Sequence, residues 1–515
     1  MVGCRKRFRK GTEVRFVDPP WNELSMEWLE LDSQVPAEHL ARRVLEAMKH
    51  LDLTPLFALY SGVGSLPIRP DLMLRVVLIE MRLGRPQPCD WFRDVRENVV
   101  LQWAAFGIRP SRTCWYDFAD RIAPLLDVWN ATVLKVAKER GVTRAERGSL
   151  DGSFVAANAS RHHLLNEKTL GQHMTELEKT CQADEANQPP QEVPSWMAKN
   201  PGTRQSQRQR YLRAAERLVE LHAVNDRQEA KQRRKREKVV VSVSDPAAAL
   251  GRDKYNVFRP LYNLQLLRDL DSPLYLAYQV FAQTTDAGTF RPLAQRSKTL
   301  TGVPLTTLLV DAGYVTTCTL ALSQQLGITL YGPWRENDYS KAATKGKKPR
   351  PLGKEHFHWD AEQNMYRCPE GHPMPQIGIQ RRRQADDQIN VMHSYCCAAK
   401  NCSACPRQPS CCSNPKRGRS VKRSEHEDLI EAHRMRMATP EAKAIYKLRK
   451  QTVELGFADL KEHRSLRQFS GRGLVRTQRQ VGLAVLVHNL LVIHRASPPQ
   501  HTGTAAVETP EEIMT

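Results

Sequence analysis

The sequence lacks any long hydrophobic run. Its longest apolar stretch, Leu483–Ile493, spans 11 residues and includes His488 and Asn489, whereas a membrane-spanning helix needs roughly 20 apolar residues. We therefore expect no transmembrane helix and no membrane partner. The first ten residues are rich in Lys and Arg, but no apolar segment follows them, so we expect no secretion signal and a cytoplasmic location.

Acidic residues are scarce relative to basic ones. The chain has 77 Lys and Arg against 56 Asp and Glu, a formal net charge of +21. This excess favours a polyanionic partner, most often nucleic acid, with simple solubility as the alternative explanation. Since a cytoplasmic chain keeps its thiols reduced, the 12 Cys call for burial, metal binding or catalysis rather than disulfides.

The hydrophobic pattern changes near residue 146. Before it, apolar residues recur at helical spacing, as in Leu40, Val44 and Met48, and predict helices over 37–50, from Pro70, and over 89–98 and 115–140. After it, the predicted order is three strands, a helix, a strand, a helix, a strand and then two helices, at about 440–463 and 474–495. Such an order favours a mixed sheet covered by helices.

Three acidic residues occupy positions from which they could converge. They are Asp151 within a predicted strand over 148–157, Asp311 at the end of a predicted strand over 305–311, and Glu454 on the helix over 440–463. Carboxylates brought together from separate elements can hold two divalent ions that cut a phosphodiester bond, and Mg²⁺ prefers oxygen ligands. Taken singly, an Asp at a strand end is more often a turn former or helix cap than a ligand, and a Glu on a helix is usually a solvated side chain.

Four stretches, taken together, resemble a known family. They are Leu150–Ser153 with Ala157–Arg161, Tyr262–Gln265 with Thr285–Asp286, Val310–Tyr314, and Arg449–Glu454 continuing through Lys461 to His488–Leu491. The chain is similar in them to the DDE transposases of bacterial insertion sequences, in particular to the group with a helical N-terminal domain and a Cys-rich insert. The resemblance covers about residues 36–495.

This resemblance implies an α/β fold with a ribonuclease-H-like mixed-sheet core, an all-α N-terminal domain and a small zinc-ribbon-like insert. It also implies that Asp151, Asp311 and Glu454 are the catalytic triad that binds Mg²⁺ or Mn²⁺, with two ions expected. Candidates for contacts with DNA phosphates are Tyr446, Arg449, Lys461 and Arg464. One departure is that four residues separate Arg449 from Glu454, where some related groups have three.

The function implied is DNA strand cleavage and strand transfer at the terminal inverted repeats of an insertion sequence. The protein would bind double-stranded DNA of the element ends and of the target, as a homo-oligomer, and would be associated with the bacterial nucleoid. Two alternatives remain open: a metal nuclease on the same fold, and a catalytically inactive DNA-binding protein derived from a transposase.

Seven of the Cys residues lie between 368 and 412. One interpretation is a zinc site in which the four thiolates are Cys368, Cys402, Cys405 and Cys411. These positions also match the Cys-rich insert of the resembled family. Further candidate ligands are Cys396, Cys397, Cys412 and His372, and the alternative is a loop without metal.

The predicted organisation has five parts. They are a helical domain at 1–145 for DNA-end binding or assembly, a first catalytic part at 146–335 with a charged helical insertion at about 162–240, a basic Cys-rich insert at 336–430, C-terminal core helices at 431–496, and a disordered tail at 497–515.

Overall fold

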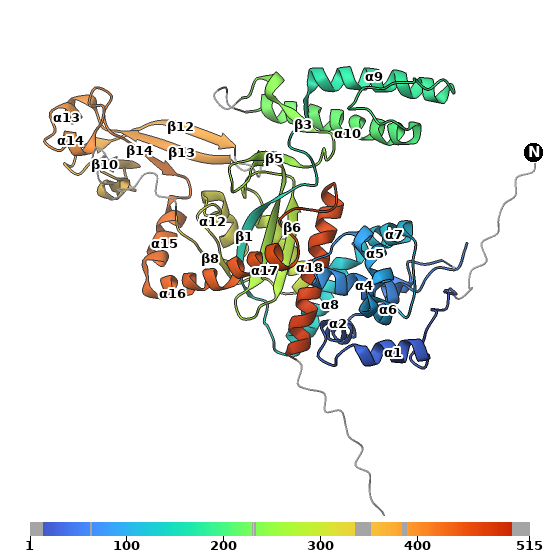
Figure 1. The fold of residues 1–515 in the computed structure, drawn as a ribbon. Coiled ribbons are helices and arrows are strands. Elements are labelled where there is room, and N and C mark those ends of the chain that lie inside the picture. Colours follow the sequence, from blue (N-terminus) through green and yellow to red (C-terminus); the bar gives the residue numbers. More distant parts are fainter. Residues whose placement is uncertain are drawn as a thin grey trace, which may run out of the picture. The chain divides into compact units, whose positions relative to one another are not determined.

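The computed structural model describes residues 14–61, 64–228, 230, 233–334, 352–383 and 389–496. These residues divide into two compact units (Figure 1). The first unit contains the residues up to Arg144, Ser272–Leu274 and the residues from Gly482 onward, and the second contains Ala145–Asp271 and Tyr275–Val481. The predicted disordered tail at 497–515 lies outside the described residues.

The first unit is helical. Its helices are α1 (Met26–Gln34), α2 (Leu40–Met48), α3 (Thr54–Phe57), α4 (Pro70–Arg82), α5 (Pro88–Glu97), α6 (Val99–Ala104), α7 (Arg112–Ile122), α8 (Leu126–Glu139) and the part of α18 (Leu474–Arg495) that follows Val481. Helix α4 is apolar on nearly all sides and almost wholly buried, which makes it the central helix of this unit. Its start at Pro70 is as predicted, because proline suits the first position of a helix.

The single helix expected over 115–140 is wrong. A short 3₁₀ turn at Ala123–Leu125 separates α7 from α8, because Pro124 has no backbone N–H to continue the helical ladder. The apolar stretch Leu483–Ile493 lies in α18, where most of its side chains are buried. No helix within the described ranges is long and apolar enough to span a membrane.

A six-stranded sheet organises the second unit. Its strands are β1 (Arg147–Ala156), β4 (Ala249–Arg252), β5 (Phe258–Asp269), β6 (Tyr275–Phe281), β7 (Thr307–Leu309) and β8 (Thr329–Tyr331). The order is β4-β5-β1-β7-β8, and β6 also pairs with β5. Strands β5 and β1 are antiparallel, whereas β7 and β8 add in parallel to β1. Figure 1 shows these strands among helices, and the protein is a mixed α/β structure, as predicted.

The parallel strands are reached through helices, as parallel connections require. Helix α11 (Phe290–Thr301) precedes β7, and α12 (Thr317–Gln325) joins β7 to β8. The predicted helix at 440–463 is interrupted: α16 (Pro440–Arg449) leads into a π-helical turn at Lys450–Glu454, and α17 (Leu455–His463) follows.

Residues 164–242 form a helical arm with its own core. Helices α9 (Glu167–Glu185) and α10 (Pro201–Asp226) pack together, next to the short strands β2 (Leu164–Asn166) and β3 (Val240–Ser242). Both helices lie within the charged helical insertion predicted at about 162–240, although the first half of that stretch has few apolar residues. The few apolar residues of α9, Leu170, Leu177 and Cys181, nevertheless share one face and are buried against α10.

The Cys-rich insert contains two small three-stranded sheets. Their strands are β9 (His358–Asp360), β10 (Met365–Arg367) and β11 (Pro373–Met374), and β12 (Gln376–Arg383), β13 (Ile389–Cys396) and β14 (Ser420–Ser424). The short helices α13 (Ala399–Ser403) and α14 (Gln408–Cys411) lie between β13 and β14, and α15 (Glu427–Ala438) follows. An aromatic and Cys-lined cluster forms the core of the insert.

Candidate active site and cysteine pocket

Asp151 lies on β1, a central strand of the sheet. The strand pairs with β5 on one side and with β7 on the other, so its backbone is held from both edges. The backbone N–H of Gly152 donates to Asp151 Oδ1 at 2.9 Å. The Asp151 side chain is 20% exposed, which places its carboxylate at the surface of the core.

Asp311 follows β7 at the level of Asp151. Since Ser149 pairs with Leu309 in the parallel register of β1 and β7, a step of two residues along each chain brings Asp151 and Asp311 to the same height. The N–H of Gly313 donates to Asp311 Oδ1 at 2.6 Å and fixes this carboxylate in the turn after the strand.

Glu454 approaches Asp151 through a shared partner, Arg449. The Arg449 guanidinium lies 2.8 Å from Asp151 Oδ2 and 3.4 Å from Glu454 Oε1. The extra residue between Arg449 and Glu454 is accommodated by the π-helical turn, because a π turn brings residues five positions apart onto one face. The unusual spacing in the sequence is therefore compatible with an Arg449–Glu454 contact.

Side chains from the sheet hold this π turn. Arg268 donates to the carbonyl of Thr452 at 2.6 Å, and the Tyr275 hydroxyl donates to the carbonyl of Gly456 at 2.9 Å. A widened turn leaves backbone carbonyls without their usual helical partners, and these two donors satisfy them. The position of Glu454 is thus built into the packing of the helix on the sheet.

The electrostatics of the site reflect crowded carboxylates. Burial raises the pKa of Asp151 to about 6; Arg449 opposes this shift, and the charges of Asp311 and Asp286 add to it. Burial also raises the pKa of Tyr446, on which the charges of Asp311, Asp151 and Glu454 all act. Both groups sense Asp311 as well as their nearer neighbours, so the acids share one electrostatic environment.

A buried hydrogen-bond network links β5 to the loop that carries Asp286 and to the loop after β7 that carries Tyr314. Gln265 donates to Asn263 and to Asp286 Oδ1, both at 2.8 Å, and Asn263 donates to Asp286 Oδ1 at 2.9 Å. The Tyr314 hydroxyl donates to Gln265 Oε1 at 2.5 Å. Gly152 is required beneath this network, because a Cβ there would lie 2.2 Å from Gln265 Nε2.

The sequence alone does not predict this network. In the sequence, Asn263, Gln265 and Asp286 belong to a stretch that resembles the family and have no role of their own. A usable signal exists: two amides alternate on one face of an otherwise apolar strand, and both are fully buried. Buried amides need hydrogen-bond partners, so an acid or a hydroxyl close by could have been expected.

The cationic candidates differ in their surroundings. Lys461 donates a hydrogen bond to the hydroxyl of Ser153, two residues beyond Asp151 on β1. Arg449 lies among the acids, and half-buried Tyr446 lies beside it. Arg464, by contrast, is 3% exposed and forms an ion pair with Asp459, so its side chain points into the protein.

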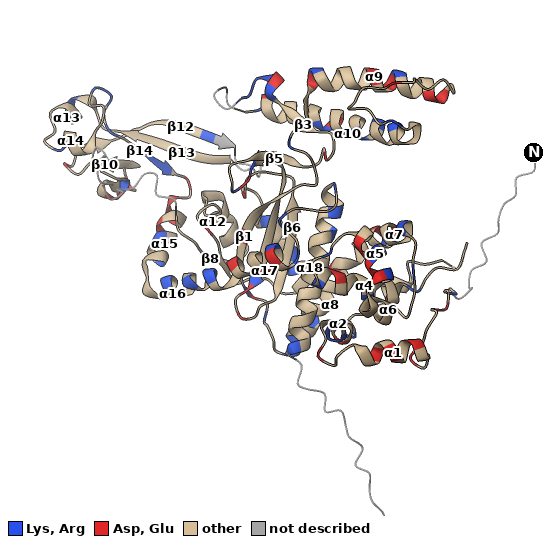
Figure 2. Cartoon of the chain, in the orientation of Figure 1, with Lys and Arg blue, Asp and Glu red and all other residues tan. Residues whose placement is uncertain are grey.

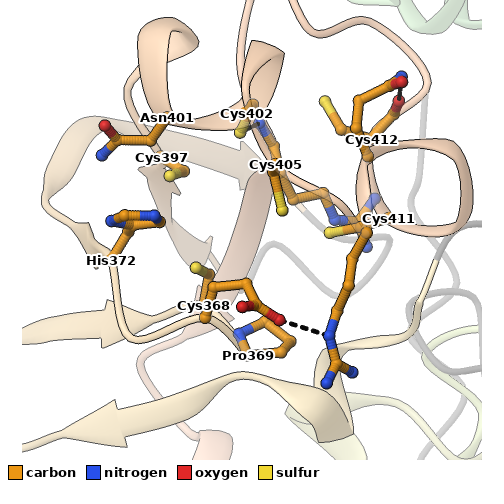
Figure 3. Close-up of a pocket in the computed structure, with 13 residues that line it drawn as sticks. Cys368, Pro369, His372, Cys397, Asn401, Cys402, Cys405, Cys411 and Cys412 are labelled. Atoms are coloured by element: carbon orange, nitrogen blue, oxygen red, sulfur yellow. Dashed lines mark hydrogen bonds and ion pairs between the residues drawn. The ribbon is translucent and has the colours of Figure 1, made fainter.

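The four predicted zinc ligands line one small cavity of about 20 Å³, room for one water-sized species. Figure 3 shows the sulfur atoms of Cys368, Cys402, Cys405 and Cys411 around this cavity, together with that of Cys397. His372 and Cys412 also line it. Cys396 does not, and its thiol donates instead to the carbonyls of Cys397 and Arg417, each at 3.4 Å.

The backbone around the cavity favours a sulfur-rich site. The N–H of Arg419 donates to Cys402 Sγ at 3.3 Å, which fixes this sulfur at the edge of the cavity. Gly418 makes this approach possible: it has a φ of +78°, and a Cβ there would lie 2.0 Å from the carbonyl oxygen of Cys397. Burial raises the pKa of Cys397 to about 12, aided by the neighbouring Cys402, so without a cation this thiol stays protonated.

Neither site has the geometry of a loaded metal centre. Across the described ranges, no three His, Cys, Asp or Glu side chains are arranged to hold a metal ion. At the acids, the Arg449 guanidinium lies between Asp151 and Glu454. At the cysteines, the sulfur atoms line the cavity without the spacing of a metal-ligand set.

Comparison with known proteins bears on the C-terminal part of the chain. A search of curated proteins gave no match. Residues 367–494, about a quarter of the chain, match the family described as transposase DDE domain. The matched segment contains Glu454, Arg449, Lys461 and the four predicted zinc ligands, and it leaves Asp151 and Asp311 outside. This match confirms the predicted resemblance to the DDE transposases: residues 367–494 are similar to a transposase DDE domain.

Proposed function

We propose that this protein cleaves DNA at the terminal inverted repeats of an insertion sequence and joins the freed strand to target DNA. The observation that carries this proposal is the approach of Asp151, Asp311 and Glu454 from a central strand, a strand end and a helix. Arg449 links the first and the last of them, at 2.8 Å and 3.4 Å. Surface acids that serve only solubility have no reason to converge in this way.

The arrangement of the sheet supports a ribonuclease-H-like core. Three antiparallel strands, β1, β5 and β6, are followed by β7 and β8, which add in parallel to β1. The acids sit on β1 and directly after β7, where functional groups of parallel strands commonly lie. We assign residues 146–335 and 431–496 to this core.

The donor set of the acidic site fits Mg²⁺ or Mn²⁺. Hard divalent cations prefer carboxylate oxygens. The negative charges of Asp311 and Asp286 contribute to the raised pKa of Asp151, and a bound cation would offset this repulsion. Asp151, Asp311 and Glu454 would hold the ions. When bound, two such ions supply an activated water and stabilise the leaving oxygen of an in-line displacement.

The remaining side chains have roles that need no metal. Arg449 holds Asp151 and Glu454 together in the free protein, and on substrate binding its guanidinium is placed to contact a DNA phosphate instead. Lys461, held against Ser153, supplies a second cation beside the acids. Tyr446 lies close enough to share their field and to contact the bound strand.

The cysteine pocket fits a structural Zn²⁺. Soft thiolates in a tetrahedral set are the ligands that zinc prefers, and the thiols of six cysteines line one small cavity. We assign Cys368, Cys402, Cys405 and Cys411 as ligands. In this role the insert at 336–430 is a zinc-ribbon-like module.

DNA is the partner that follows from this activity. The excess of +21 favours binding to phosphates irrespective of sequence, whereas recognition of element ends requires contacts with base edges. We assign end recognition or assembly to residues 1–145. A homo-oligomer on DNA and a location at the nucleoid complete the proposal.

Cleavage of a labelled element-end duplex in the presence of Mg²⁺ tests this function. Asp151→Asn, Asp311→Asn and Glu454→Gln should each lower the cleavage rate by about 10³-fold or more, because each removes a charged metal ligand and nearly preserves shape. Binding of the same duplex should stay within about threefold of wild type.

The matched control is Glu441→Gln, which removes an exposed acid from the start of α16 and should cleave normally. Near-wild-type cleavage by any triad variant would remove that residue from the site. Cleavage without joining of the 3′ end to a target duplex would favour the nuclease alternative, and end binding without cleavage by the wild type would favour the inactive DNA-binding protein.

A further inference from the structure

The turn between β4 and β5 is rigidly built and directs two side chains outward. Asp253 accepts hydrogen bonds from the N–H groups of Tyr255 and Val257, at 2.9 and 3.0 Å, and Asn256 adopts a left-handed conformation with φ of 63°. Lys254 lies 4.8 Å from the ring centre of Tyr255, and Tyr255 is 67% exposed. The ordered turn therefore holds an aromatic ring at the surface, where its face can stack on a sugar or base.

This turn lies beside cations from α17 and from the turn that follows it. Tyr255 is close to both Lys254 and Arg467, and these two cations lower its pKa, Lys254 having the larger effect. Lys254 and Arg467 also act on Lys461, whose pKa is lowered by burial first and by these two like charges next. Three cations from two distant parts of the sequence therefore share one small region of the catalytic unit.

The acids nearby compensate this charge only in part. Glu462 forms an ion pair with Arg467 at 2.5 Å, and Asp151 is the other acid that acts on Lys461 in this direction. Gathering like charges is unfavourable in the free protein and is relieved when an anion binds. The arrangement is typical of a preformed anion site.

The location of the cluster identifies the anion. Lys461 contacts Ser153, and Ser153 and Asp151 point to the same face of β1, separated by about 7 Å along the strand. A nucleotide chain whose reacting phosphate lies at the acids would place a neighbouring phosphate at Lys461. A continuous DNA strand therefore fits better than an isolated anion.

We propose that Lys254, Lys461 and Arg467 form a subsite for a phosphate of the DNA strand next to the cleaved bond, and that Tyr255 packs against the sugar or base of that nucleotide. The proposal rests on the proposed function for the identity of the strand. It adds the β4–β5 turn, which lies outside the segment that matches the DDE family, to the DNA-binding surface. Figure 2 shows Lys and Arg on several elements of this unit; this cluster is distinguished by its contact with β1.

The test is a double-mutant cycle between Lys254 and one phosphate of the DNA. Binding of an element-end duplex is measured without divalent metal, for wild type and Lys254→Gln, with single phosphates near the cleavage point replaced in turn by neutral methylphosphonate. Lys254→Gln should weaken binding of unmodified DNA about three- to fivefold and lower the log–log salt slope by about 1. At one or two adjacent positions, the methylphosphonate should abolish the difference between the two proteins.

The controls separate this subsite from general charge effects. Lys298→Gln removes an exposed charge from α11 in the same unit. The ratio of its affinity to that of wild type should be the same whichever phosphate is replaced, so no coupling is expected. Tyr255→Ala should weaken binding about tenfold, whereas Tyr255→Phe, which keeps the ring, should bind as wild type does. Inorganic phosphate at millimolar concentration should compete weakly, since it offers one contact of several.

Purely additive effects of Lys254→Gln and every methylphosphonate would overturn the proposal, as would equal binding by Tyr255→Ala and wild type. Because the readout is binding without metal, its outcome is independent of cleavage. If the cycle shows coupling but wild-type protein cleaves nothing, the subsite stands and the proposed catalytic function falls.

Discussion

The acidic site and the cysteine pocket both gather like groups, yet they do so in opposite ways. Asp151, Asp311 and Glu454 come from three elements separated by more than a hundred residues each, and an internal cation, Arg449, joins two of them. The pocket thiols come from a single short region, in which Arg407 and Arg419 also line the cavity; burial raises the pKa of Cys411 and Cys412, and Arg419 opposes this shift.

This difference teaches how each site should respond to metal. A site with its own cation is compensated before any ion arrives, and the sheet fixes its backbone through strand pairing. It should stay folded without metal. A pocket of thiols on short helices and turns has less secondary structure to hold it, and such segments commonly fold around their ion.

Of the effects predicted here, the exposure of the pocket thiols after removal of zinc should be the largest. Cys402→Ser, or a strong chelator, should release about one zinc per chain and expose the remaining pocket thiols to alkylation, because a thiolate is lost from a four-ligand set. Alkylation followed by mass spectrometry, with elemental analysis, measures both. Chelation of Mg²⁺ alone should leave hydrogen exchange of β1 and β5 unchanged.

Cys396→Ser is the control for this experiment, since its thiol bonds to backbone carbonyls outside the cavity. It should retain zinc. If the wild-type protein contains no zinc and its pocket thiols are nevertheless protected from alkylation, the apolar core alone holds the insert. That result would contradict the proposed difference between the two sites.

Glu80 in the helical unit is a further acidic side chain buried among like charge. It is completely buried on α4, and neither carboxylate oxygen has a hydrogen-bond partner within the described part of the chain. Its neighbour Asp94 takes both nearby cations, Arg85 at 2.5 Å and Arg93 at 2.8 Å. Burial, and next the charge of Asp94, raise the pKa of Glu80 to about 8, so Glu80 keeps a proton.

The stability of this unit should therefore depend on pH with a definite sign. Because the pKa of Glu80 is higher in the folded state than its ordinary value of 4.5, its contribution is fully present below pH 4.5 and is lost as the pH rises to about 8. Glu80→Gln cannot ionise and should unfold with little pH dependence from this group. At pH 8 the variant should be the more stable, on the order of 1–3 kcal/mol.

Urea unfolding of wild type and Glu80→Gln from pH 5 to 8.5, monitored by tryptophan fluorescence, measures this difference. Most of the large buried tryptophans lie in the helical unit, so the signal reports on it. Parallel curves for the two proteins across this range would mean that Glu80 is ionised in the folded state and finds a cation.

Much of this organisation could be predicted from the sequence where a strong local pattern exists. Asp151 and Asp311 follow apolar strand residues, and the cysteines cluster along the chain, so both sets were found. The bounds of α9 within the predicted helical insertion could not be predicted, because its apolar stripe is sparse, and helix 115–140 was predicted without its break at Pro124. The succession of β1, β5, β6, β7 and β8 along the chain was predicted, because each contains an apolar stretch, whereas β4 was missed.

The partners of the acids could not be predicted in the same way. The spacing from Arg449 to Glu454 looked like a departure from the family, since a sequence gives no sign of a π turn held by Arg268 and Tyr275. Asp286 meets Asn263 and Gln265 only because β5 and the chain after β6 lie together. Contacts of this kind depend on tertiary packing.

The central claim is that Asp151, Asp311 and Glu454 form one cation site in which Arg449 takes the place of a metal until DNA arrives. Titration with Mn²⁺, followed by electron paramagnetic resonance without DNA, tests it most directly. Arg449→Gln should bind Mn²⁺ about tenfold more tightly than wild type, since a competing charge at 2.8 Å from Asp151 is removed, and Asp151→Asn should lose the binding. Equal Mn²⁺ affinity in wild type, Arg449→Gln and Asp151→Asn would contradict the account.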